Sequence, residues 1–254
     1  MQSMLVLTVF LLLSSCQRSV VGSPRVDPTV YPIGDYLASD TASSPARTVA
    51  ITIAPYSAQL GDRMNRVLAE VATPLVKGRP ESSLGNWTAD LLLAAAREVF
   101  PERTVAFAIQ NYGGIRVTEI GTGPLTVAEL YELMPFDNEL VLVQLSGTQL
   151  AEFLTHTIAG GGWPVSAGVS IEQVDGEPIQ VLIGGQPLRK AATYYVAMPD
   201  YVANGGDQAA MLVGTPQQAS GRLVRDLLIE QAARLSEPIR VPAASGRIQL
   251  AHEP

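Results

Sequence analysis

Glycine and proline are frequent enough in this chain to argue against some architectures. The 254 residues include 22 Gly and 18 Pro, more than the usual share of about 12% for the two together. Because proline ends helices and glycine favours turns, such a chain forms many short elements. This argues against an all-helical bundle. With 47% hydrophobic and 16% charged residues, the chain is nevertheless expected to fold around a substantial core.

Charge and ligand-forming residues narrow the possible functions. Lys and Arg number 17 against 24 Asp and Glu, a net charge of −7, which argues against a nucleic-acid polymer as partner. The single Cys excludes a disulfide framework within the chain, and two His leave few ligands for a metal centre. We therefore expect no metal or cofactor bound by this chain. His156 is predicted to be a surface or structural residue of a helix, and His252 to be inert.

The N-terminus has the pattern of a secretory signal. An apolar run at 5–13 is followed by Ser-Ser and Cys16. The run is too short to span a bilayer but suits a signal-peptide core, so 1–15 is predicted to be a signal peptide. Its end resembles the lipobox of bacterial lipoproteins, which implies acylation of Cys16. The alternative is a short buried strand with a buried thiol.

The following stretch is interpreted as a spacer. Residues 16–46 contain four prolines among Ser, Gly and Asp and predict a flexible tether. Gln17 after the cysteine, rather than Asp, favours the outer membrane by resemblance to enterobacterial lipoprotein sorting. We expect a lipid-anchored protein of the bacterial cell envelope that faces the periplasm.

Strand and helix patterns alternate irregularly through 47–254, which is expected to be one domain. The predicted strands are 48–53, 67–76, 104–109, 139–145, 168–174, 178–183, 193–198 and 246–250. The predicted helices are 57–64, 86–99, 126–134, 147–158 and 219–235. The irregular order and the expected hairpins favour an α+β fold with mixed sheets.

Two glycine-rich loops and one helix end carry candidate binding residues. The first loop, 111–116, follows a buried strand; its glycines allow positive φ and close approach of a ligand, while Asn111 and Arg116 offer directed hydrogen bonds. The second, 201–207, carries an aromatic residue and a carboxylate. By spacing alone, ordinary turns are the favoured interpretation of both loops, and a core position is the favoured interpretation of Phe136 at the helix end.

Together these side chains suit one kind of ligand. Two aromatic residues on loops can sandwich a flat base, and base stacking contributes roughly 1–3 kcal/mol per base in nucleic-acid binders. Amide, guanidinium and carboxylate groups can then bind the hydroxyls of a ribose.

Four motifs in order resemble the C-terminal domain of the 5'-nucleotidase family. Residues 81–86 are similar to its E-S-x-L-G-N, and 111–116 to its N-x-G-x-I-R. Residues 134–138 are similar to L-P-F-x-N, and 193–207 to Y-x-V-A followed by Y-x-A-x-G-G-D. The resemblance implies a layered α/β/β/α structure with mixed sheets.

The resemblance also implies roles for individual residues. In the family this domain binds the nucleoside, so Phe136 and Tyr201 would stack on the base and Asn111 would hydrogen-bond it. Arg116 and Asp207 would hold the ribose hydroxyls. Gly168 would let the base approach the backbone. Arg79 stands near the family's basic position before E-S-x-L-G-N, where it would contact ribose or phosphate, but it is out of register.

In that family a separate N-terminal domain holds two metal ions and a catalytic His–Asp pair. The residues before the matching region contain no His, so this chain is expected to lack that domain and any catalytic residue. The resemblance therefore implies the nucleotide-recognising part of a phosphoester hydrolase of nucleotide catabolism, acting with a separately encoded metallophosphatase that binds the two divalent metals. The alternative is a stand-alone periplasmic lipoprotein that binds nucleosides or nucleotides without catalysis. A third possibility is an interaction module that keeps the fold and has lost the ligand.

Overall fold

The computed structural model describes residues 44–174 and 179–251. The chain divides into two units, Met1–Ala54 and Pro55–Pro254, which are described separately below. Among the described residues, no helix is both long and apolar enough to cross a membrane.

The predictions for the N-terminus lie outside this part. The signal peptide 1–15, Cys16, Gln17 and the tether as far as residue 43 are not among the described residues, and neither is His252. Lipidation and localisation therefore stay predictions.

The described chain begins with helix α3 (Ser44–Met64), which runs from the first unit into the second. The strand predicted at 48–53 is therefore wrong, whereas the helix predicted at 57–64 is part of α3. The β-branched residues that suggested a strand include Val49 and Ile53, which are 59% and 51% exposed. Such residues favour strands mainly where they pack on a half-buried sheet, and here the helical backbone leaves them on the surface.

A four-stranded mixed sheet forms the centre of the second unit. Its order is β11 (Gln217–Leu223), β6 (Glu139–Ser146), β10 (Thr193–Pro199) and β3 (Val105–Ala108). β6 is antiparallel to both of its neighbours, and β3 is parallel to β10. The mixed pairing confirms the predicted α+β fold.

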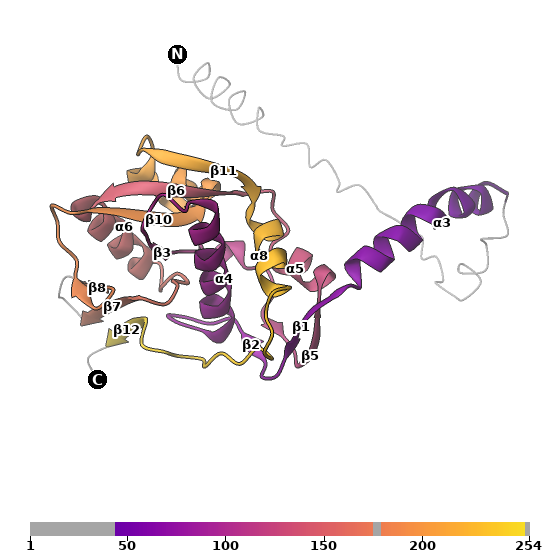
Figure 1. Ribbon diagram of the computed structural model, residues 1–254, viewed down its shortest axis with the longest axis horizontal. Coiled ribbons are helices and arrows are strands. Elements are labelled where there is room, and N and C mark those ends of the chain that lie inside the picture. Colours follow the sequence, from indigo (N-terminus) through magenta and orange to yellow (C-terminus); the bar gives the residue numbers. More distant parts are fainter. Residues whose placement is uncertain (1–43, 175–178, 252–254) are drawn as a thin grey trace, which may run out of the picture. The chain divides into compact units, whose positions relative to one another are not determined.

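Successive residues of these strands point into two separate hydrophobic cores, as the period of two in a strand requires. On β6, Leu140 and Leu142 belong to the core under helices α4 (Ser83–Val99) and α8 (Val224–Ala232), which lie side by side in Figure 1. Val141 and Val143 belong to the core under α6 (Gly147–Ala159) and a second sheet. The central sheet is therefore covered on both faces.

The second sheet has the order β12-β7-β8-β9 and is also mixed. Its strands are β7 (Val169–Val174), β8 (Gln180–Ile183), β9 (Gln186–Pro187) and β12 (Ile248–Ala251). Two small antiparallel pairs complete the set: β1 (Val67–Val71) with β5 (Gly123–Thr126), and β2 (Leu75–Val76) with β4 (Glu119–Ile120). The single strand predicted at 67–76 is thus two strands with different partners.

Helix α5 begins where its cap predicts. Thr126 and Glu129 form the expected capping box of α5 (Val127–Leu133), which satisfies backbone N–H groups that the helix leaves free. The helix predicted at 219–235 is wrong at its start, because 217–223 form the edge strand β11 and α8 begins at Val224. The polar sequence of this edge strand has no alternating apolar pattern, and its pairing with β6 decides its conformation.

Candidate functional site

Sheet topology brings three loops of the chain to one edge. β3 and β10 are parallel neighbours, so the loops that follow them, at 109–116 and 200–208, start from the same edge. β6 is antiparallel to β10 and pairs Leu140 with Pro199, so the segment just before β6 lies at that edge as well. Asp200 links the 200–208 loop to the segment before β6, because its Oδ1 accepts the backbone N–H of Glu139 at 3.1 Å.

A hollow of about 260 Å³ opens between these loops, near the lower limit for small-molecule sites. Its lining residues are Asn111, Gly113, Gly114, Arg116, Phe136, Asn138, Tyr201 and Asp207. Phe136 is 37% exposed and Tyr201 46%, so the interpretation of Phe136 as a core residue is wrong. Five of the seven predicted substrate-binding residues therefore line one hollow, and both aromatic side chains are open to solvent.

A chain of hydrogen bonds orients the polar groups of the hollow. Buried Gln110 donates through Nε2 to Oδ1 of Asn111 at 2.7 Å, and Asn111 donates through Nδ2 to Oδ2 of Asp207 at 2.7 Å. The Tyr201 hydroxyl donates to the other Asp207 oxygen at 3.0 Å. The carboxylate is thus held in place by two residues of the hollow, and its remaining lone pairs can accept from a ligand.

The glycines of the two loops allow close packing of side chains. Gly113 and Gly114 do not adopt the positive φ that glycine allows. A methyl group at Gly114 would overlap with the Gln110 and Asn111 side chains, and one at Gly206 would overlap with the Tyr201 ring. These glycines make room for the side chains that shape the hollow.

Basic residues gather beside the hollow. The Arg116 guanidinium carbon lies 5.7 Å from the centre of the Phe136 ring. Lys77 Nζ and the Arg79 guanidinium carbon lie 4.0 and 3.9 Å from the centre of the Tyr112 ring. Burial lowers the pKa of Lys77, and the charges of Arg116 and Arg79 lower it further. Among the described residues, neither arginine has a carboxylate within salt-bridge distance.

Arg79 and Gly168 lie outside this hollow. Arg79 lines a neighbouring hollow of about 410 Å³ that shares Gly113 and Asp207 with the first. Gly168 has φ +92° and lines a third hollow beside Ser245 and Arg247. The structure therefore does not bring Gly168 together with the aromatic pair. The volume of a hollow does not by itself identify the site. A larger hollow of about 490 Å³, between 73–83 and 240–243, has no aromatic residue among its described lining residues.

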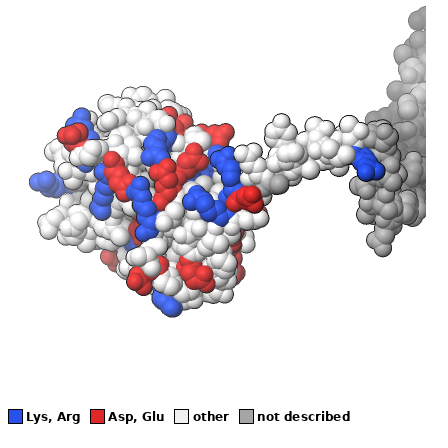
Figure 2. Space-filling model, turned by 45° about the vertical axis from the view of Figure 1, so that its right-hand side comes forward, with Lys and Arg blue, Asp and Glu red and all other residues white. Residues whose placement is uncertain are grey.

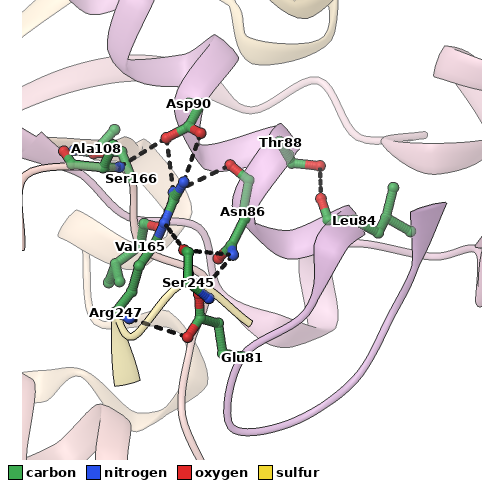
Figure 3. A network of polar contacts seen from close by, with 11 residues as sticks. Glu81, Leu84, Asn86, Thr88, Asp90, Ala108, Val165, Ser166, Ser245 and Arg247 are labelled. Carbon is green, nitrogen blue, oxygen red and sulfur yellow. Dashed lines mark hydrogen bonds and ion pairs between the residues drawn. The ribbon is translucent and has the colours of Figure 1, made fainter. Parts of the chain in front are cut away.

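The motif at 81–86 has a structural role. Figure 3 shows Glu81 beside Ser245 and Arg247 near the C-terminus. Its carboxylate accepts from Asn86 Nδ2, from the Ser245 hydroxyl and from the backbone N–H groups of Ser245, Gly246 and Arg247, at 2.7–3.1 Å. Burial alone would raise the pKa of Glu81, but these hydrogen bonds outweigh it and hold the pKa below its usual value.

An ion pair completes this network. Both terminal nitrogens of Arg247 donate to the Asp90 carboxylate on α4, at 2.7 and 2.8 Å, and Figure 3 shows this paired contact. Bidentate pairing of this kind is among the stronger polar contacts in proteins. The motif therefore fastens the C-terminal segment to α4.

Sequence reasoning missed three residues around the site: Gln110, Tyr112 and His156. His156 Nε2 donates to the backbone carbonyl of Asp207 at 2.9 Å, so this histidine contacts the site loop. Gln110 and Tyr112 flank Asn111 in the sequence, and this position was the signal that could have identified them as residues near the site. His156 had none, because its contact joins α6 to a loop 51 residues later.

The surface charge and the possible metal ligands do not help to define the site. On the face drawn in Figure 2, basic and acidic side chains are interspersed. No group of three or more His, Cys, Asp or Glu that could hold a metal ion occurs within the described ranges.

Comparison with known proteins identifies the family. Residues 67–214, more than half of the chain, match the sequence model of the 5'-nucleotidase C-terminal domain. The chain belongs to this family. A 5'-nucleotidase of Vibrio vulnificus (strain CMCP6) is 30% identical over 139 residues, covering 53% of this chain and 25% of the relative. The trifunctional nucleotide phosphoesterase protein YfkN of Bacillus subtilis (strain 168) is 31% identical over 185 residues, covering 66% of this chain and 12% of the relative.

Solved structures agree with this assignment. The 5'-nucleotidase precursor from Thermus thermophilus has a TM-score of 0.68 and 27% identity, covering 82% of this chain and 43% of that one. The NAD nucleotidase of Haemophilus influenzae has a TM-score of 0.61 at 18% identity, covering 89% of this chain and 46% of that one, and supports the fold. The resemblance and the layered mixed-sheet fold are thus confirmed. The chain spans a quarter or less of the two curated relatives.

Proposed function

We propose that this chain recognises the nucleoside part of a nucleotide. One observation carries the proposal: the exposed rings of Phe136 and Tyr201 line the same hollow as Asn111, Arg116 and Asp207. An aromatic pair provides a sequence-tolerant surface for a flat base. The amide, guanidinium and carboxylate groups are suited to the base edge and the ribose hydroxyls.

The cluster of Lys77, Arg79 and Arg116 adds a place for the phosphate end of the ligand. Lys77 and Arg79 lie over the Tyr112 ring, whereas Arg116 lies over the Phe136 ring and lines the hollow. Guanidinium groups bind phosphate oxygens well. We propose that hydrolysis itself is performed by a separate metallophosphatase that binds two divalent metals, since phosphate-ester cleavage of this type needs a dimetal site.

The binding proposal is tested by calorimetry with adenosine and AMP on the full chain. We expect F136A and Y201A each to weaken adenosine binding about tenfold, because each removes one stacking surface. L182A is the matched control, since Leu182 is 40% exposed and does not line this hollow. If wild type binds neither ligand, or if both variants bind as wild type does, the proposal fails.

A stand-alone binding protein is the second candidate. The hollow is formed within this chain, which favours binding without a partner. AMP hydrolysis by candidate metallophosphatases, measured with and without this chain, separates the two functions. Stimulation that is lost in F136A supports the split enzyme; adenosine binding without any effect on hydrolysis supports the binding protein.

We also propose that Cys16 is acylated and anchors the protein in the bacterial envelope, facing the periplasm. The support is the sequence pattern of 1–16. Incorporation of labelled palmitate into wild type but not into C16S, with loss of C16S from the membrane fraction, is the expected result.

A further inference from the structure

The loop that carries Asp207 has an unusual backbone. Asp207 and Gln208 have φ values of 49° and 64°, and they are the two non-glycine residues with positive φ in the described part of the chain. This region is unfavourable for residues with a Cβ, although Asp tolerates it better than most. Such conformations persist where surrounding contacts hold them, and they often occur at functional sites.

The contacts that hold Asp207 come from both sides of its backbone. Its N–H donates to the Tyr201 hydroxyl at 3.2 Å. Its carbonyl oxygen accepts from His156 Nε2 at 2.9 Å. Because a carbonyl oxygen can only accept, Nε2 must carry a proton. His156 thus connects the loop to α6, an element of the rigid core.

The His156 ring is itself fixed in place. It packs edge-on against Trp163, with ring centres 5.8 Å apart and planes at 80°. Trp163 is 5% exposed and makes a second edge-on contact with buried Phe153. The donor therefore approaches Asp207 from a packed aromatic cluster.

We infer that His156 is a positioning residue for the Asp207 carboxylate. It holds the backbone turn at Asp207, which aims the carboxylate into the hollow shared with Asn111 and Tyr201. His156 itself does not line that hollow. The inference rests on the proposed nucleoside function and adds that ribose binding depends on a helix outside the three site loops.

The test compares ligands with and without ribose hydroxyls. H156F keeps an aromatic ring against Trp163 but removes the N–H donor, whereas H156Q keeps a donor at the same distance along the side chain. T155A is the matched control, on the exposed face of the same helix. Dissociation constants for adenosine and 2',3'-dideoxyadenosine are measured by calorimetry on the full chain.

We expect H156F to weaken adenosine binding about fivefold and to leave dideoxyadenosine binding unchanged. H156Q is expected to stay within about twofold of wild type, because its side-chain amide can replace the donor, and T155A is expected to match wild type. Equal weakening of both ligands, or no weakening of adenosine binding, would overturn the inference.

A second measurement separates this inference from the proposed function. If wild type binds neither ligand, the nucleoside proposal fails, and amide hydrogen exchange at Asp207 and Gln208 decides the role of His156. Faster exchange at these amides in H156F than in T155A supports positioning; equal exchange in the two variants overturns it.

Discussion

Glu81 and Asp207 are carboxylates of two motifs that resemble the same family, yet their surroundings differ. Glu81 accepts hydrogen bonds from three consecutive backbone N–H groups and from two side chains. Asp207 is exposed, sits on a strained turn and accepts side-chain hydrogen bonds from Asn111 and Tyr201, which line the hollow. A carboxylate with all its acceptor positions used serves the fold, whereas one with acceptor positions left open can serve a ligand.

Removal of the Glu81 carboxylate gives the largest expected effect. E81A should lower the free energy of unfolding by about 2–3 kcal/mol, because hydrogen bonds to a charged acceptor are strong and several donors would lose their partner. Urea unfolding measures this change. E102A, at an exposed position, is the control and should remain within about 0.5 kcal/mol of wild type. Wild-type stability of E81A would show that the network does not fasten the C-terminal segment.

At Asp207 we expect the opposite pattern. D207N keeps the shape of the side chain and tolerates the left-handed backbone, but it loses the charged acceptor. Adenosine affinity should fall at least about tenfold, while the free energy of unfolding changes by less than about 1 kcal/mol. Calorimetry measures the affinity and urea unfolding measures the stability, both on the same preparation. A stability loss as large as that of E81A would remove the distinction between the two carboxylates.

A smaller effect concerns pH. The hydrogen bonds that lower the pKa of Glu81 favour its ionised form in the folded state. An unfolded glutamate takes up its proton near pH 4.3, so the stabilisation is present above that pH and is lost as the pH falls through the folded-state pKa. The free energy of unfolding of wild type should therefore decrease more steeply than that of E81Q below about pH 4.3. Parallel curves from urea unfolding across this range would contradict the lowered pKa.

The smallest expected effect on binding is at Gly168. Alanine at its positive φ should cost about 1 kcal/mol of stability. Adenosine affinity should stay within about twofold of wild type, because Gly168 lines a different hollow from Phe136 and Tyr201. Clearly weaker binding by G168A would instead support the contact with the base that the family resemblance implies.

Several elements could be predicted because their signals are local. The capping box at Thr126 and Glu129 defines the start of α5, and the apolar spacing of 86–99 indicates most of α4. The predictions failed where the tertiary surroundings of a segment, rather than its local sequence, decide its conformation. Residues 48–53 have strand-forming side chains but lie exposed on a helix, and 217–223 have a polar sequence but pair with β6.

The sequence by itself determined the family, the order of most elements and the residues of the candidate binding loops, because motifs, caps and hydrophobic periodicity are properties of neighbouring residues. Only the tertiary structure decided which of those residues meet. The parallel pairing of β3 with β10 brings Asn111 to Asp207 across 96 residues. Contacts between other distant segments place Glu81 against the C-terminal segment and His156 against Asp207. These contacts depend on strand pairing and helix packing between distant segments, which no short stretch of sequence specifies.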